Sequence, residues 1–199
     1  IEVFKEQYPS LESYWRSIIL FGRNVASYKF ALAESLLELA PTGKTVITLD
    51  ELAVPFSKYL CQHIENAPKQ ATSQKSQFLD ACKQYNDGLI SHQKLIDVTV
   101  AKGFNNVIDA FHVVNRGNIP VEIYKLQETP FADNFAVEAE SRWNLVETAW
   151  GLNISRNLLN VRYDDESKIF FVDSNFRRKD VTSARGALNG YQKGKCFYC

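Results

Sequence analysis

The sequence predicts a mainly α-helical protein with one small β-hairpin, an α+β arrangement dominated by helix. Apolar residues recur at helical spacing through most of the first 158 positions. Two β-rich arms then flank a polar turn, and a short basic segment ends the chain. These three observations divide the sequence into a helical domain over 1–158, a hairpin over 159–175 and a basic connector helix with a terminal cysteine pair over 176–199.

Composition supports one sizeable core. Of 199 residues, 45% are hydrophobic and 13% aromatic, with nine Gly and six Pro, which is typical of an ordinary globular chain. No apolar run approaches the roughly 18 residues that span a bilayer, and the acidic N-terminal stretch lacks a signal-peptide pattern. We therefore expect no membrane partner and a cytoplasmic location. The chain begins at Ile1 and contains no Met, which indicates an excerpt of a longer protein.

The first helices are predicted from their caps and stops. Ser10 is a candidate N-cap for a helix with apolar residues at helical spacing up to Phe21. A second helix, VASYKFALAESLLELA, is stopped by Pro-Thr-Gly at 41–43. Thr48 and Glu51 have capping-box spacing and begin a third helix. Pro55 should lie close to that helix's start, because proline is tolerated only there.

The rest of the helical domain alternates loops and helices. The segment 65–76, ENAPKQATSQKS, has no apolar period and is predicted to be a flexible surface loop. FLDACKQYNDG and SHQKLIDVTVAKG are predicted helices that end at a glycine. GNIPVEIYKL has β-branched alternation, and a long helix follows that should bury Phe135. The other side chains that we expect to be buried are Trp15, Phe21, Phe30, Leu36, Trp143, Val146 and Trp150.

The last 42 residues change character. LLNVRYDDESKIFFVDSN has two apolar arms around a turn of four or five polar residues, which predicts the hairpin. RRKDVTSARGALNGYQKG is polar and basic, and it predicts a short helix that leads into the cysteines.

Charge is distributed unevenly along a chain whose formal charge is zero. Residues 176–199 carry six basic side chains against the single acid Asp180, a net +5, so the preceding residues carry −5. Such a basic end indicates contact with an anionic partner, most often DNA; the alternative is a solvated basic helix face. The candidate phosphate-contacting residues are Arg177, Arg178, Lys179, Arg185, Lys193 and Lys195.

Cys196 and Cys199 form a C-x-x-C pair at the end of the chain. A redox disulfide would place this motif at the start of a helix, whereas here it follows one. Two buried structural thiols would give the flanking Gly and Lys no role. We favour half of a structural zinc site, which needs about four ligands. Cys61 and Cys82 lie on apolar helical faces, where a cysteine is usually a small core residue, so the remaining ligands are expected beyond Cys199.

The stretch RGALNGYQKGKCFYC resembles the beginning of the HNH endonuclease module of bacterial nucleases. In that family a first C-x-x-C knuckle precedes the catalytic ββα-metal hairpin. LFGRNVASYKFALAESLLEL and SRWNLVETAW resemble stretches from the helical N-terminal portion of larger bacterial HNH proteins. The resemblance implies that the helical domain leads into a truncated ββα-metal and zinc-knuckle module.

The resemblance also implies the chemistry. HNH enzymes hydrolyse phosphodiester bonds with a histidine general base and a divalent metal. The residues that do this follow the first knuckle, so no catalytic residue is assigned to this chain. The expected cofactors are a structural zinc and a catalytic divalent metal in the missing part. The alternatives are a non-catalytic zinc-containing DNA-binding or regulatory protein, and a helical domain that binds a protein partner.

Overall fold

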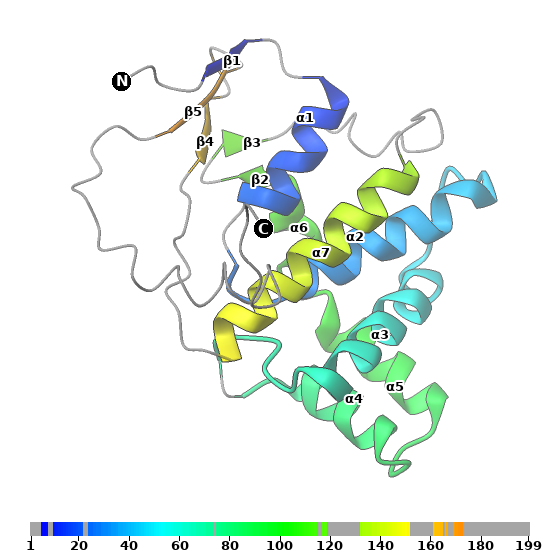
Figure 1. Ribbon diagram of the computed structural model, residues 1–199. Helices are drawn as coiled ribbons and strands as arrows, with labels where there is room; N and C mark the ends of the chain where they lie inside the picture. The colour runs from blue at the N-terminus through cyan, green and yellow to red at the C-terminus, as the bar shows by residue number, and fades with distance from the viewer. Residues whose placement is uncertain are drawn as a thin grey trace.

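The computed structural model describes residues 5–7, 10–21, 24–73, 75–114, 117–118, 132–151, 161–164, 166 and 169–172. Most of these residues are helical, so the mainly α class that the sequence predicts is confirmed (Figure 1). The described elements, in chain order, are β1 (Lys5–Gln7), α1 (Leu11–Arg16), the π-helical η1 (Ser17–Phe21), α2 (Tyr28–Leu39), the 3₁₀ turn η2 (Ala40–Thr42), α3 (Leu49–Asn66), α4 (Gln77–Asn86), α5 (His92–Val98), the π-helical η3 (Thr99–Gly103), α6 (Val107–Phe111), β2 (Val113–Val114), β3 (Gly117–Asn118), α7 (Ala132–Gly151), β4 (Val161–Asp164) and β5 (Ile169–Val172).

Side-chain caps begin four of the helices. The hydroxyls of Ser10, Thr48, Ser76 and Ser91 each accept a hydrogen bond from the backbone N–H three residues later, at 3.2–3.3 Å. These bonds satisfy amides that have no partner within the helix. The Glu51 carboxylate in turn accepts a 2.9 Å hydrogen bond from the Thr48 backbone N–H, so the predicted capping box is confirmed. The starts of α1 and α3 are therefore encoded locally.

The expectation for Pro55 is wrong. Pro55 is the seventh residue of α3, inside the helix rather than at its start, and it is buried. Its ring removes the amide that would bond to the carbonyl of Glu51. The helix continues because its apolar face, including Phe56 and Leu60, packs fully into the core.

α2 lies at the centre of the core, beside α3 and α7 (Figure 1). Small residues on α2, among them Ala31, Ala33 and Ser35, are almost completely buried and let the neighbouring helices approach closely. Burial is confirmed for most of the predicted anchors, namely Trp15, Phe30, Phe135, Trp143, Val146 and Trp150. Leu36 is only half-buried, because the next residue, Leu37, takes the core position. The side chain of Phe21 lies outside the described residues.

The segment between α3 and α4 is irregular, as predicted, but it is anchored rather than free. Ala71 forms an antiparallel bridge with Ala26, through hydrogen bonds of 2.9 Å from Ser27 N to Gln70 O and from Thr72 N to Val25 O. The side chain of Gln70 is buried beneath α7. Polar composition predicted a flexible surface loop, whereas the buried hydrogen bonds of Gln70 hold this segment against the helices.

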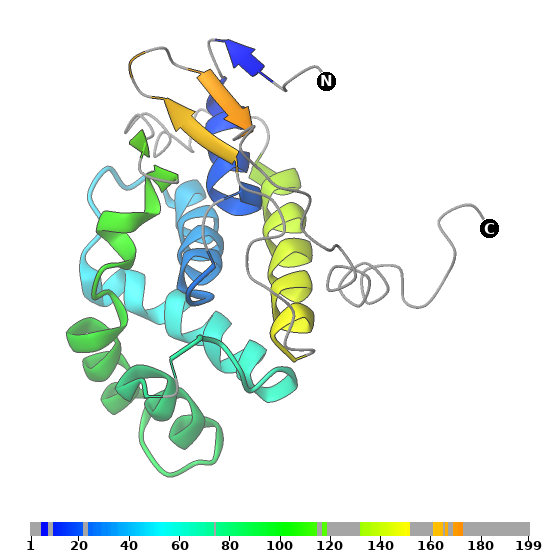
Figure 2. The ribbon, with the colours of Figure 1, turned by 90° about the vertical axis from the view of Figure 1, so that its left-hand side faces the viewer.

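Two small sheets complete the described part. β4 and β5 fall within 159–175, where the sequence predicts a hairpin, and they pair antiparallel with Tyr163 opposite Phe170. β1, which the sequence analysis did not identify, adds to the other edge of β5. β2 and β3 form a separate antiparallel pair. Figure 2 shows the three-stranded sheet beside α1, at the opposite end of the molecule from α4 and α5.

Two predictions for the end of the chain concern residues that the structure does not describe. The connector helix over 176–199 and the ββα-metal module lie outside the described residues. Within the described ranges, no helix combines the length and the apolar character needed to cross a membrane.

Candidate functional site

The residues that the sequence nominates for DNA and zinc binding lie outside the described part of the chain. They are Arg177, Arg178, Lys179, Arg185, Lys193, Lys195, Cys196 and Cys199. The two other cysteines, Cys61 and Cys82, are buried in the core with free thiols, as expected. Within the described ranges, no three His, Cys, Asp or Glu side chains are grouped so that they could hold a metal ion.

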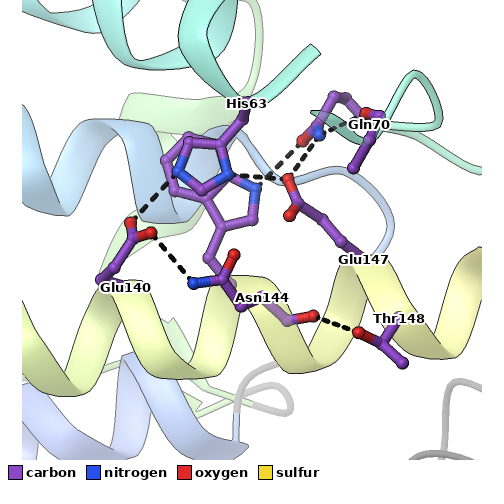
Figure 3. Close-up of polar contacts among 8 residues, drawn as sticks. His63, Gln70, Glu140, Asn144, Glu147 and Thr148 are labelled. Atoms are coloured by element: carbon purple, nitrogen blue, oxygen red, sulfur yellow. Dashed lines mark hydrogen bonds and ion pairs between the residues drawn. The ribbon is translucent and has the colours of Figure 1, made fainter. Parts of the chain in front are cut away.

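The structure does bring together a polar centre between α3, the 67–76 segment and α7. We call it the His63 centre; its members are His63, Gln70, Glu140, Trp143 and Glu147 (Figure 3). Glu140, Trp143 and Glu147 are three and four residues apart on α7, so they share one helical face. α3 supplies the imidazole from its last turn.

Both ring nitrogens of His63 face a carboxylate. Nδ1 lies 2.8 Å from Glu147 Oε1, and Nε2 lies 3.1 Å from Glu140 Oε2. The Glu147 side chain is 8% exposed, whereas that of Glu140 is 51% exposed and also accepts a 2.9 Å bond from Asn144. One side of the centre is therefore buried, and the other opens to solvent.

Gln70 connects the Glu147 carboxylate to the indole of Trp143. Its amide nitrogen donates to Glu147 Oε1 at 2.5 Å and to Ala67 O at 2.8 Å, and its carbonyl accepts from Trp143 Nε1 at 3.0 Å. The buried amide therefore donates through its nitrogen to two acceptors and accepts one hydrogen bond through its oxygen. The Gln70 orientation is fixed, and with it the loop that carries this residue.

The imidazole stacks flat on Trp143, with ring centroids 3.5 Å apart and an interplanar angle of 0°. Burial alone would lower the pKa of His63, but its hydrogen bonds to the carboxylates of Glu140 and Glu147 outweigh burial and raise the pKa to about 9. The ring is an imidazolium at neutral pH, and the indole face below it is a favourable surface for a cation. A histidine that holds its proton between two carboxylates has no free lone pair and cannot serve as a general base.

A second group of titratable residues lies near Glu140 and consists of Glu34 and Glu38 of α2 and Tyr59 of α3. Glu34 is 7% exposed, and its Oε1 has no hydrogen-bond partner. Burial, with a smaller contribution from Glu140, raises the pKa of Glu34 to about 7, against an opposing effect of His63. Next to it, Tyr59 donates a 2.7 Å hydrogen bond to Glu38, which lowers the pKa of that carboxyl. Glu34 therefore titrates near neutral pH, whereas Glu38 stays ionised.

Two basic side chains, Lys29 of α2 and Arg142 of α7, are half-buried and lie close enough to interact. Lys29 donates to Ile18 O at 3.0 Å and lies 4.9 Å from the centre of the Phe30 ring. Burial lowers the pKa of Lys29, and the nearby guanidinium of Arg142 lowers it further. Burial also lowers the pKa of Arg142.

The sequence analysis singled out no histidine of this chain. What it missed is the pairing of His63 with α7. One signal was present: Glu140, Asn144 and Glu147 follow one another at helical spacing around Trp143. The partner of that acidic face lies 77–84 residues earlier in the chain, where no local pattern points to it.

Comparisons with known protein families, with curated proteins and with solved structures found no match to this chain.

Proposed function

We propose that the chain is the N-terminal region of a DNA endonuclease that hydrolyses phosphodiester bonds, with its catalytic HNH residues after Cys199. The observation that carries the proposal is the terminal stretch RGALNGYQKGKCFYC, whose C-x-x-C pair ends a segment, residues 176–199, of net charge +5. The charge suits a phosphate backbone, and the knuckle suits a zinc-supported nuclease module.

The donor atoms fit the metal that this proposal requires. Cys196 and Cys199 would supply two of the roughly four ligands of a structural zinc, which prefers thiolates in a tetrahedral arrangement. Lys195 favours the deprotonated thiols. Bound zinc would stabilise the fold of the knuckle. A separate divalent metal would assist phosphate hydrolysis in the part of the protein that follows.

The helical body has a positioning role in this proposal. α7 ends at Gly151, and the basic segment follows later in the sequence. The end of α7 is held firmly, because Trp150 is buried and its carbonyl accepts a 3.1 Å hydrogen bond from Lys69. The His63 centre fixes the middle of the same helix. A rigid helix of this kind is a suitable support for a connector that must present basic residues to DNA.

The first test uses a longer protein that includes the residues after Cys199. We expect elemental analysis to find stoichiometric zinc in this protein. We also expect the protein to nick supercoiled plasmid in the presence of Mg²⁺ or Mn²⁺. The double variant Cys196→Ser/Cys199→Ser should lose the zinc, and the matched variant Cys61→Ser/Cys82→Ser should keep it. Absence of zinc from the longer protein would refute the knuckle. Duplex binding without cleavage would favour the non-catalytic DNA-binding alternative.

The second test concerns the basic segment. On a helix, Arg178 and Arg185 lie seven residues apart on one face, whereas Arg177 and Lys179 diverge from it. We expect Arg178→Ala/Arg185→Ala to weaken duplex DNA binding more than Arg177→Ala/Lys179→Ala at low salt. Each lost phosphate contact should reduce the slope of log affinity against log salt by about one. Unchanged affinity and slope in the first double variant would leave a solvated basic face and favour a protein partner.

A further inference from the structure

Two cysteines that are 21 positions apart in the sequence meet where α3 crosses α4. Cys61 is 6% exposed and Cys82 is 0% exposed. The Cys61 thiol lies 3.8 Å from the backbone carbonyl oxygen of Cys82, to which it donates. Asn86 of α4 donates a 2.8 Å hydrogen bond back to the carbonyl of Cys61. The two helices are therefore held together at the cysteines themselves.

The two thiols are also unequal. The interaction with the neighbouring Cys82 thiol lowers the pKa of Cys61. The interaction with Cys61, followed by burial, raises the pKa of Cys82. Cys61 is thus the first of the pair to become a thiolate, the nucleophilic form, while Cys82 keeps its proton. Cys61 is also the more exposed of the two. A thiolate beside a second thiol is the usual arrangement of a thiol pair that reacts with oxidants.

We propose that Cys61 and Cys82 are a redox-active pair that closes to a disulfide between α3 and α4 when the protein meets a hydroperoxide. In the first step the Cys61 thiolate attacks the terminal peroxide oxygen, which forms a sulfenic acid and releases water or an alcohol after proton uptake. In the second step the sulfur of Cys82 attacks the sulfur of Cys61, which forms the S–S bond and releases water. The peroxide takes up the two electrons that the thiols lose.

The position of the pair determines what the disulfide would do. It would close a loop that contains the end of α3, the anchored 67–76 segment and the start of α4. His63 and Gln70, which hold α7, both lie in this loop. A cross-link that closes a loop of this length restricts the unfolded chain and should raise Tm by roughly 5–10 °C. Oxidation would thereby tighten the part of the body that supports α7.

The test uses this chain with Cys196→Ser and Cys199→Ser, so that only the two core thiols remain. The protein is treated with hydrogen peroxide, blocked with an alkylating reagent in denaturant and digested with trypsin. Cleavage after Lys58, Lys69, Lys75 and Lys83 separates the peptides 59–69 and 76–83, each with one cysteine. We expect these two peptides to be joined, and dithiothreitol to separate them and to reverse the rise in Tm.

Single variants test the order of the steps. In Cys82→Ser, the sulfenic acid on Cys61 has no second thiol, so dimedone should label Cys61. In Cys61→Ser, Cys82 should stay reduced under the same treatment. The proposal is overturned if both thiols stay reduced after peroxide treatment, or if Cys61 is converted to sulfinic acid without any joined peptide. Labelling of Cys82 in preference to Cys61 would overturn the assigned order.

Discussion

The His63 centre gives a quantitative prediction about stability and pH. The ordinary pKa of histidine is 6.5, and in the folded chain the pKa of His63 is raised to about 9. Between these values the folded state holds a proton that the unfolded state has released. The free energy of unfolding must therefore fall as pH rises. The contribution is fully present below pH 6.5 and is lost as pH passes through 9.

The magnitude follows from the difference between the two pKa values. One pKa unit corresponds to about 1.4 kcal/mol, so this shift is equivalent to about 3 kcal/mol. The His63 side chain is only 10% exposed, so solvent screening reduces this figure little. Glu34 affects stability at lower pH than His63 does. Its pKa is raised to about 7, so its effect on the free energy of unfolding is nearly complete at pH 7. The window from pH 7 to 9.5 therefore reports on His63, on the thiols and on Lys29, whose pKa is lowered by burial.

The assay is urea denaturation of wild type and His63→Gln under reducing conditions, at half-unit steps from pH 6.5 to 9.5. Unfolding is monitored by tryptophan fluorescence. The thiols and Lys29 contribute equally to both proteins, so the difference between their unfolding free energies isolates His63. We expect this difference to shrink by about 3 kcal/mol across the range. The matched control is His92→Gln, because His92 is exposed and should keep the wild-type slope. Parallel curves for wild type and His63→Gln would refute the reasoning.

Three further predictions concern the same body. Trp143→Ala should lower the free energy of unfolding by roughly 3–5 kcal/mol, because it leaves a cavity and removes the stacking surface of His63; denaturant unfolding against Trp143→Phe would measure this, and a loss below 1 kcal/mol would contradict it. Glu34→Gln should stabilise the protein by about 2 kcal/mol at pH 8 and leave it unchanged at pH 4, since an ionised buried carboxylate is removed only at the higher pH; equal effects at both values would show that Glu34 is not ionised in the core. Thr48→Ala should cost about 1 kcal/mol through loss of the capping box, whereas Thr42→Ala, which is outside any capping box, should cost less in the same thermal denaturation assay.

The helix starts and most buried anchors could be predicted because they depend on neighbours in the sequence. The Thr48 and Glu51 pair caps α3 through bonds within three residues, and Trp143 and Val146 lie on an apolar stripe of one helix. The prediction for Pro55 was wrong because its position in α3 depends on tertiary packing. Local rules count the lost hydrogen bond of a proline but not the burial of the helical face around it.

The candidate sites divide in the same way. The sequence by itself determined the helical class, the positions of the caps and the basic C-terminal segment with its cysteine pair, since each of these is a property of adjacent residues. Only the tertiary structure decided that His63 pairs with Glu140 and Glu147, and that Cys61 meets Cys82. These contacts depend on how α3 packs against its neighbours. The ridges and grooves that set such packing are formed by many side chains at once, so no short stretch of sequence encodes them.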